Sequence, residues 1–236
     1  MTKILLIPII AMTILLCFSV QDAHASLYDS INDCNALGGL LSGTMCGVGG
    51  GFTFYPGDTL TIPSGATLEL TFYGIINSGG IINNYGTITI SDYLYNGIIN
   101  NGGTINNYGT ITISSNTGNG IKNYNGGTIT NNSVGQITVS NTGGTGITNT
   151  DTINNYGTIT ISNTGGTGIY NQGGTINNFA TITVSNTAGT GILNAGTIKI
   201  SKGGYITNSG KILVCGKITG NIKNSGTGTV TKTCTY

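Results

Sequence analysis

Residues 168–187 read GIYNQGGTINNFATITVSNT, and variants of this stretch recur from about residue 74 to about residue 200. Apolar side chains return at three points of each period. These points are marked by Ile75, Ile98, Ile121, Ile147, Ile169 and Ile192; by Ile82, Ile105, Ile129, Ile153 and Ile176; and by Ile88, Ile111, Ile137, Ile159 and Ile182. Three apolar points per period of about 23 residues are typical of a solenoid with three short strands per coil. The sequence therefore predicts an all-β fold, a single-domain parallel β-helix of about eight coils over residues 52–236.

The repeat also suits the inside and the corners of a coil. In Thr-Ile-Thr-Ile the isoleucines share one face of a strand and the threonines the other. Glycine and asparagine suit sharp corners. The recurring asparagines are Asn77, Asn100, Asn123, Asn149, Asn171 and Asn194 at one corner, and Asn83-Asn84, Asn106-Asn107, Asn131-Asn132, Asn154-Asn155 and Asn177-Asn178 at another. We expect them to form ladders along the rod rather than a polar binding strip.

The first residues have the pattern of a secretory signal. A basic start ending at Lys3 precedes an apolar run over residues 4–20, and Ala23-His24-Ala25 fits a cleavage site. The sequence predicts a mature start at Ser26, with an uncleaved anchor as the alternative and no transmembrane segment in the mature chain. The predicted layout is a signal peptide (1–25), an N-terminal cap (26–51) with a short helix over 30–37, β-helix repeats (52–205), and last coils with a C-terminal cap (206–236).

Four cysteines remain after residue 25, namely Cys34, Cys46, Cys215 and Cys234. An exported protein with this count is expected to form two disulfides, and three pairings are possible. We favour Cys34–Cys46 and Cys215–Cys234, because a rod of stacked coils keeps its ends apart. The competing interpretation is a metal site. The mature chain has neither a Cys-x-x-Cys motif nor a histidine, so we expect no metal and no cofactor.

Charge and acid content argue against several functions. The net charge is +1 and arginine is absent, so we expect no nucleic-acid partner. Asp92 and Asp151 are the only acids inside the repeats, and they occupy different positions of the period. Enzymes with a β-helix fold rely on clustered carboxylates, calcium ligands or a strong base. The sequence therefore predicts a non-enzymatic protein without catalytic residues, with a carbohydrate-active enzyme as a less favoured alternative.

Outward threonines and tyrosines are the candidate binding residues. Thr-x-Thr pairs are formed by Thr87 and Thr89, Thr110 and Thr112, Thr158 and Thr160, and Thr181 and Thr183, and an aromatic column by Tyr85, Tyr108, Tyr156 and Phe179. Threonine is also the ordinary choice for a solvated strand, and stacked rings can simply shield a corner. In the middle coil, Gln136 replaces one threonine and Ser133 interrupts the aromatic column.

Lysines gather after the clear repeats, at Lys199, Lys202, Lys211, Lys217, Lys223 and Lys232, with no acid after Asp151. Lysines on an exposed last coil discourage pairing with other chains. The functional alternative is binding to an anionic surface polymer. Asn131-Asn132-Ser133 is the one glycosylation sequon.

The Gly-Thr-Ile-x-Asn-x-Gly-Thr-Ile rhythm resembles parallel β-helix and haemagglutinin-type repeats of secreted adhesins. A second resemblance, over about residues 34–230, is to secreted archaeal repeat proteins. It rests on Cys34, Gly38-Gly39 and Cys46, then on Pro56-Gly57-Asp58-Thr59-Leu60-Thr61-Ile62-Pro63-Ser64-Gly65, and on the repeats that follow. These resemblances imply a right-handed coil and an extracellular location.

Together these features predict a secreted or cell-surface structural or adhesive protein. Its repeated Thr, Asn and Tyr side chains would make multivalent contacts with surface polysaccharide, other cell-surface components or further copies of the chain. The alternative is a protein that binds ice or another crystalline surface through the Thr-x-Thr array.

Overall fold

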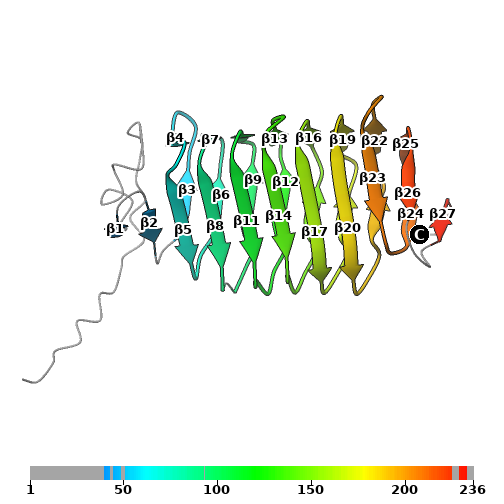
Figure 1. Cartoon of the computed structure of the whole chain (residues 1–236), viewed down its shortest axis with the longest axis horizontal. Coiled ribbons are helices and arrows are strands. Elements are labelled where there is room, and N and C mark those ends of the chain that lie inside the picture. The colour runs from blue at the N-terminus through cyan, green and yellow to red at the C-terminus, as the bar shows by residue number, and fades with distance from the viewer. Residues whose placement is uncertain (1–39, 43–44, 49–50, 93, 225–228, 233–236) are drawn as a thin grey trace, which may run out of the picture.

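The computed structural model describes residues 40–42, 45–48, 51–92, 94–224 and 229–232, and all its regular elements are strands. The strands lie side by side along one long axis, from β2 near the N-terminal end to β26 and β27 near the other (Figure 1). From β3 to β26 the strands form eight successive sets of three, with one strand from each sheet in every set. The chain makes about seven full turns from the first set to the last. The predicted parallel β-helix, with its period of about 23 residues, is confirmed.

Within the described ranges, three sheets run the length of the rod. Sheet A contains β4 (Thr59–Ile62), β7 (Ile81–Asn84), β10 (Thr104–Asn107), β13 (Thr128–Asn131), β16 (Thr152–Asn155), β19 (Thr175–Asn178), β22 (Thr197–Ile200) and β25 (Lys217–Thr219). Sheet B contains β1 (Leu40–Ser42), β2 (Met45–Val48), β5 (Thr67–Thr71), β8 (Thr87–Ser91), β11 (Thr110–Ser114), β14 (Gln136–Ser140), β17 (Thr158–Thr164), β20 (Thr181–Thr187), β23 (Tyr205–Asn208) and β26 (Ile222–Asn224). Sheet C contains β3 (Phe52–Phe54), β6 (Ile75–Asn77), β9 (Ile98–Asn101), β12 (Ile121–Tyr124), β15 (Ile147–Asn149), β18 (Ile169–Asn171), β21 (Ile192–Asn194), β24 (Ile212–Val214) and β27 (Val230–Thr231).

The core is a column of aliphatic side chains inside the coils. Each typical coil contributes one isoleucine from sheet C, one from sheet A and two residues from sheet B, as Ile75, Ile82, Ile88 and Ile90 do. Each isoleucine lies over its counterpart in the next coil, because the strands pair in parallel without a shift in register. Burying one such side chain stabilises the fold by about 1.5–3 kcal/mol. All three predicted apolar columns are therefore confirmed as core.

Asparagines form two ladders inside the coil, as predicted. The CA ladder, at the corner between sheets C and A, consists of Asn77, Asn100, Asn123, Asn149, Asn171 and Asn194. The AB ladder, between sheets A and B, consists of Asn84, Asn107, Asn131, Asn155 and Asn178. All eleven side chains are fully buried. In both ladders each Nδ2 donates to Oδ1 of the next coil at 2.7–2.9 Å, except that the last members, Asn194 and Asn178, donate to backbone oxygens.

Apolar residues close both ladders at both ends. Phe54 and Val214 occupy the positions next to the first and last members of the CA ladder. Ile62 and Ile200 do the same for the AB ladder. The terminal coils therefore have more apolar interiors than the central ones, and the amide chains stop before they reach the ends of the rod.

One part of the predicted asparagine alignment was wrong. Asn131, rather than Asn132, pairs with Asn107 and Asn155, and Thr130 takes the outward asparagine position. Asn132 therefore occupies the place that an aromatic residue holds in neighbouring coils, and it, not Ser133, interrupts the aromatic column. The register of β13 decides this, because Asn132 follows Asn131 directly, as Tyr108 follows Asn107. The two extra residues of the 132–135 connection, compared with residues 108–109, come after that position.

The first described strands lie outside the eight sets. β2 pairs in parallel with β5 and places Cys46 on Leu68, where it is fully buried. β1 pairs antiparallel with β2 and so covers that edge of sheet B. The helix expected over residues 30–37 lies outside the described residues, as do Cys34 and Cys234. The two disulfide pairings therefore stay predictions.

The loops between sheets B and C form a further stack that the sequence analysis did not anticipate. Successive loops are joined by backbone hydrogen bonds, for example from Gly118 N to Tyr95 O at 3.1 Å and from Gly144 N to Gly118 O at 3.0 Å. Gly166 and Gly189 continue the same chain of contacts. The glycine-rich loops are therefore stacked along the rod beside sheet C and joined by backbone hydrogen bonds.

Candidate binding surface

The outward face of sheet B carries the predicted threonine pairs in continuous columns. Thr87, Thr110, Gln136, Thr158 and Thr181 form the first column, and Thr89, Thr112, Thr138, Thr160, Thr183 and Thr207 form the second. Gln136 interrupts the first column, as predicted, but the second is unbroken over six coils. Hydroxyl groups thus repeat about every 4.8 Å along the rod and about every 6.7 Å along a strand.

A third column on sheet B was missed. Thr71, Ser91, Ser114, Ser140, Ser162 and Ser185 continue the two threonine columns and are half-buried. They follow each Thr-Ile-Thr-Ile segment in the sequence, so the period-2 alternation could have identified them. The face therefore presents three hydroxyl columns rather than two.

The outward face of sheet A has two polar columns of its own. One is mainly threonine, with Thr104, Thr128, Thr152, Thr175 and Thr197, and the other mainly asparagine, with Asn83, Asn106, Asn154 and Asn177. The outer asparagines bond in pairs, from Asn106 Nδ2 to Asn83 Oδ1 and from Asn177 Nδ2 to Asn154 Oδ1, both at 2.9 Å. Thr130 separates the two pairs.

Aromatic side chains lie on the corner between sheets A and B. Tyr85 stacks on Tyr108 with ring centroids 4.7 Å apart, and Tyr156 stacks on Phe179 at 4.5 Å. Asn132 separates the two stacked pairs. The rings are 38–47% exposed, so their edges reach solvent while one face of each ring is covered by its neighbour. The predicted aromatic column is thus two stacked pairs, each beside one pair of outer asparagines.

The glycosylation sequon lies in the core. Asn131 is fully buried, and its Nδ2 donates to Asn155 Oδ1 at 2.8 Å and to the backbone oxygens of Gly135 and Thr158 at 3.1 Å. An enzyme acting on the folded protein could not reach this amide. The sequon is therefore explained by the ladder.

The two carboxylates within the repeats that could take part in catalysis, Asp92 and Asp151, lie far from each other. Asp92 follows β8 at the corner between sheets B and C, while Asp151 lies between β15 and β16 at the opposite corner and three coils further on. Thr150 donates to Asp151 at 3.1 Å, and the buried Asp58 accepts a hydrogen bond from Tyr55 N at 2.8 Å within its own turn. In the described part of the chain, no three His, Cys, Asp or Glu side chains form a cluster suited to a metal ion.

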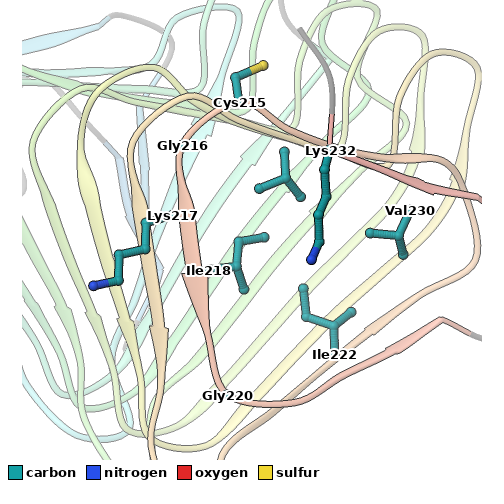
Figure 2. A pocket seen from close by; sticks show the side chains of 9 residues that line it. Cys215, Gly216, Lys217, Ile218, Gly220, Ile222, Val230 and Lys232 are labelled. Atoms are coloured by element: carbon teal, nitrogen blue, oxygen red, sulfur yellow. The ribbon is translucent and has the colours of Figure 1, made fainter.

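A hollow of about 620 Å³ lies at the C-terminal end of the rod (Figure 2). It is lined by Val214, Ile218, Ile222 and Val230, and the Lys232 side chain extends between Ile218 and Val230. The first three of these pack against the core from one side only. The hollow thus lies at the end of the aliphatic column, and its lining is mixed, because Lys217 and Lys232 also line it.

Exposed apolar residues gather at the other end, where sheet B turns into sheet C. Phe72, Tyr73, Leu94 and Tyr95 are 52–70% exposed. Phe72 has a φ of 83°, at a corner where the later coils use Asn141, Asn163 and Asn186. A phenylalanine in the left-handed region is unusual, since asparagine and glycine adopt it more readily. These four residues follow no period of the repeat, so the sequence pattern did not predict the group.

A scan against protein-family models and searches of curated proteins and of solved structures found no match for the chain. The described residues contain no apolar helix of membrane-spanning length.

Proposed function

We propose that this protein is a secreted or cell-surface rod that acts without catalysis and binds surface polysaccharide through repeated outward side chains. The observation that carries the proposal is the alignment of the outer asparagine pairs with the aromatic pairs. Asn83, Asn106, Tyr85 and Tyr108 form one group, and Asn154, Asn177, Tyr156 and Phe179 repeat it three coils further along.

Both groups offer chemistry that suits sugars. Asparagine amides donate and accept hydrogen bonds, and aromatic edges and faces cover the apolar side of a sugar ring. Each contact is weak at an exposed site. Two identical groups on a rigid rod raise the effective concentration of the second contact once the first has formed. Repetition, rather than one deep pocket, would supply the affinity.

The test is retention of the purified mature protein on three insoluble polysaccharides: microcrystalline cellulose, chitin and cross-linked dextran. We expect binding to at least one, and we expect a Tyr85→Ala/Tyr156→Ala double variant to lose most of it. Each substitution removes one ring from one stacked pair. Retention unchanged by the double variant, or no retention of the wild-type protein on any of the three, would contradict the proposal.

Tyr95→Ala is the matched control, because Tyr95 is 65% exposed but lies on the corner between sheets B and C. It should bind like the wild-type protein. Equal losses in Tyr95→Ala and the double variant would mean that aromatic exposure in general, rather than the corner between sheets A and B, determines binding.

Binding to ice or another crystalline surface is a second candidate. The unbroken column from Thr89 to Thr207 favours it, since a lattice match needs regular spacing over several coils. Thermal hysteresis that disappears in Thr160→Tyr, but survives in Thr152→Tyr on sheet A of the same coil, would support this function. Ordinary ice growth at high concentrations of the wild-type protein would refute it.

Export and the two disulfides form part of the same proposal. Immunogold labelling of intact cells should locate the protein outside the cytoplasm, and mass spectrometry of the unreduced protein should find a new N-terminus at Ser26 with Cys34–Cys46 and Cys215–Cys234 linked. A cytoplasmic, uncleaved protein with all five cysteines reduced would contradict export.

A further inference from the structure

Both polar columns of sheet A contain a lysine within their last two positions. Thr175 and Thr197 of the threonine column are followed by Lys217 on β25, and Asn154 and Asn177 of the asparagine column by Lys199 on β22. Lys217 pairs with Thr197 and Lys199 pairs with Thr219, so the two lysines are diagonal neighbours on adjacent strands. Side chains in this arrangement lie roughly 7–8 Å apart at their bases.

A third lysine joins them at the adjacent corner. Ser201 is the first residue after β22, and its backbone N–H donates to Asn178 O. Lys202 comes next. Phe179 N makes the equivalent bond to Asn155 O one coil earlier, so Ser201 continues the aromatic column. Lys199, Lys202 and Lys217 are all exposed. Sheet A and its aromatic corner therefore end in a group of three cations, which we call the sheet A lysine group.

Edge protection does not explain this group as a whole. β25, β26 and β27 are the last strands of their sheets, and Lys217, Lys223 and Lys232 lie on or beside them. Lys199, in contrast, lies on β22, which is paired on both sides by β19 and β25. An inner strand has no free edge to guard, so Lys199 and the adjoining Lys202 call for another explanation.

The lysines also lack nearby acids along the chain. No aspartate or glutamate follows Asp151 in the sequence, while six lysines do. Cations close together on one face repel each other, and a polyanion along the face would relieve that repulsion. The attraction acts over about one Debye length, roughly 10 Å at 0.1 M salt.

We propose that the sheet A lysine group makes the polysaccharide ligand of this rod an acidic one. Uncharged sugar units would lie along the threonine and asparagine columns of sheet A, with a carboxylate or sulfate held at Lys199, Lys202 and Lys217. This inference rests on the proposed function and adds the charge of the ligand and its direction along the rod.

An acidic glycan fits better than a nucleic acid. The chain contains no arginine to form bidentate bonds with phosphate, and the cations occupy one end of the face rather than its length. Apart from the exposed Ile81 at the N-terminal end, the remaining outward positions on sheet A carry hydroxyl or amide groups, which can form hydrogen bonds with sugar hydroxyls. A polymer with hydroxyl groups throughout and acidic groups at intervals can contact both the threonine and asparagine columns and the sheet A lysine group.

The experiment measures binding of polygalacturonate and dextran sulfate by isothermal titration calorimetry in 20 mM and 200 mM salt. We expect Lys199→Gln/Lys202→Gln to weaken binding by about tenfold, because two contacts between a cation and the polyanion are lost together. Lys223→Gln/Lys232→Gln removes the same charge from sheet B and from the end hollow, and it should leave binding within about twofold of wild type. Binding of the wild-type protein should weaken in 200 mM salt.

Equal losses in the two double variants would overturn the inference, since only overall charge would then matter. So would absence of binding to both polyanions in 20 mM salt, or equally tight, Lys199-dependent binding of duplex DNA. Failure of the proposed function looks different. In that case the neutral polysaccharides are not retained, or Tyr85→Ala/Tyr156→Ala retains them fully, whatever the lysine variants do.

Discussion

Buried asparagines bring polarity into a core that is otherwise aliphatic. Burying an amide costs free energy unless its donors and acceptor are paired. Asn123 illustrates the solution, since its Nδ2 donates to Asn149 Oδ1 at 2.8 Å and to the backbone oxygens of Gly127 and Thr152 at 3.0 and 3.1 Å. Its Oδ1 accepts from Asn100 at 2.8 Å. Each amide thus joins two coils and also holds its own corner.

Asn123→Ala should therefore be costly. It leaves Asn149 Oδ1 buried without its donor and Asn100 Nδ2 without one of its acceptors. An unsatisfied buried group costs about 1–3 kcal/mol, so we expect the free energy of unfolding to fall by roughly 2–4 kcal/mol in urea titrations. Asn106→Ala, which removes a half-buried amide bonded only to Asn83, should cost less than about 1 kcal/mol. Equal effects would contradict the ladder's structural role.

At this scale the sequence predicted residue roles well where the period was regular. Isoleucines, corner asparagines and outward threonines lie where alternation places them. Asn131 and Asn132 were assigned to positions one earlier in the period than those they occupy, because adjacent identical residues hide a shift of register. Burial of Asn131 could be recognised only once its pairing with Asn107 and Asn155 was known.

Among the elements, glycines before the sheet C strands set how closely the coils approach. One position is shared by Gly97, Gly120, Gly146, Gly168 and Gly191. Each of these carbonyls accepts a hydrogen bond from the preceding coil, as Gly146 O does from Ile121 N at 2.9 Å. A Cβ on Gly146 would lie 2.5 Å from Ile161 Cγ2 and 2.6 Å from Gly168 O. The second atom is backbone and cannot turn aside.

Gly146→Ala should accordingly destabilise the rod by more than the roughly 1–3 kcal/mol of ordinary overpacking. Gly126→Ala is the comparison, because Gly126 has a φ of 87° and open space around it, so only backbone strain of about 1–2 kcal/mol is expected. Chemical denaturation of both variants gives the two values. A Gly146 variant as stable as wild type would mean that the coils can separate locally at low cost.

The strands were predictable because each carries its own alternation, whereas the connections were not. The stacked loops between sheets B and C are joined by backbone hydrogen bonds. Such bonds require no apolar side chains, so they produce no apolar periodicity in the sequence. The place of Asn132 in the aromatic column likewise depends on the register of β13, which the adjacent asparagines obscure in the sequence. Contacts made by the backbone, or by inserted residues, cannot be predicted from the periodicity of side chains.

At the scale of the whole molecule, the rod is a series of nearly equivalent coils with distinct ends. β1 covers one edge of sheet B. The opposite end has a hollow lined by apolar side chains and by lysines, which lie on or beside its last strands. A coil can be added to or removed from such a rod without altering the packing of the other coils, because each coil contacts only its neighbours. Binding through repeated weak contacts must then depend on the number of coils.

The most direct test varies that number. Residues 147–168 form one complete period, so their deletion joins Gly146 to Ile169 and their duplication adds a coil with the same junction. Apparent affinity for the retained polysaccharide should fall in the shortened rod and rise in the lengthened one, by a similar factor each way, while circular dichroism confirms that all three proteins are folded. Equal affinity in the three folded proteins would contradict binding by repetition.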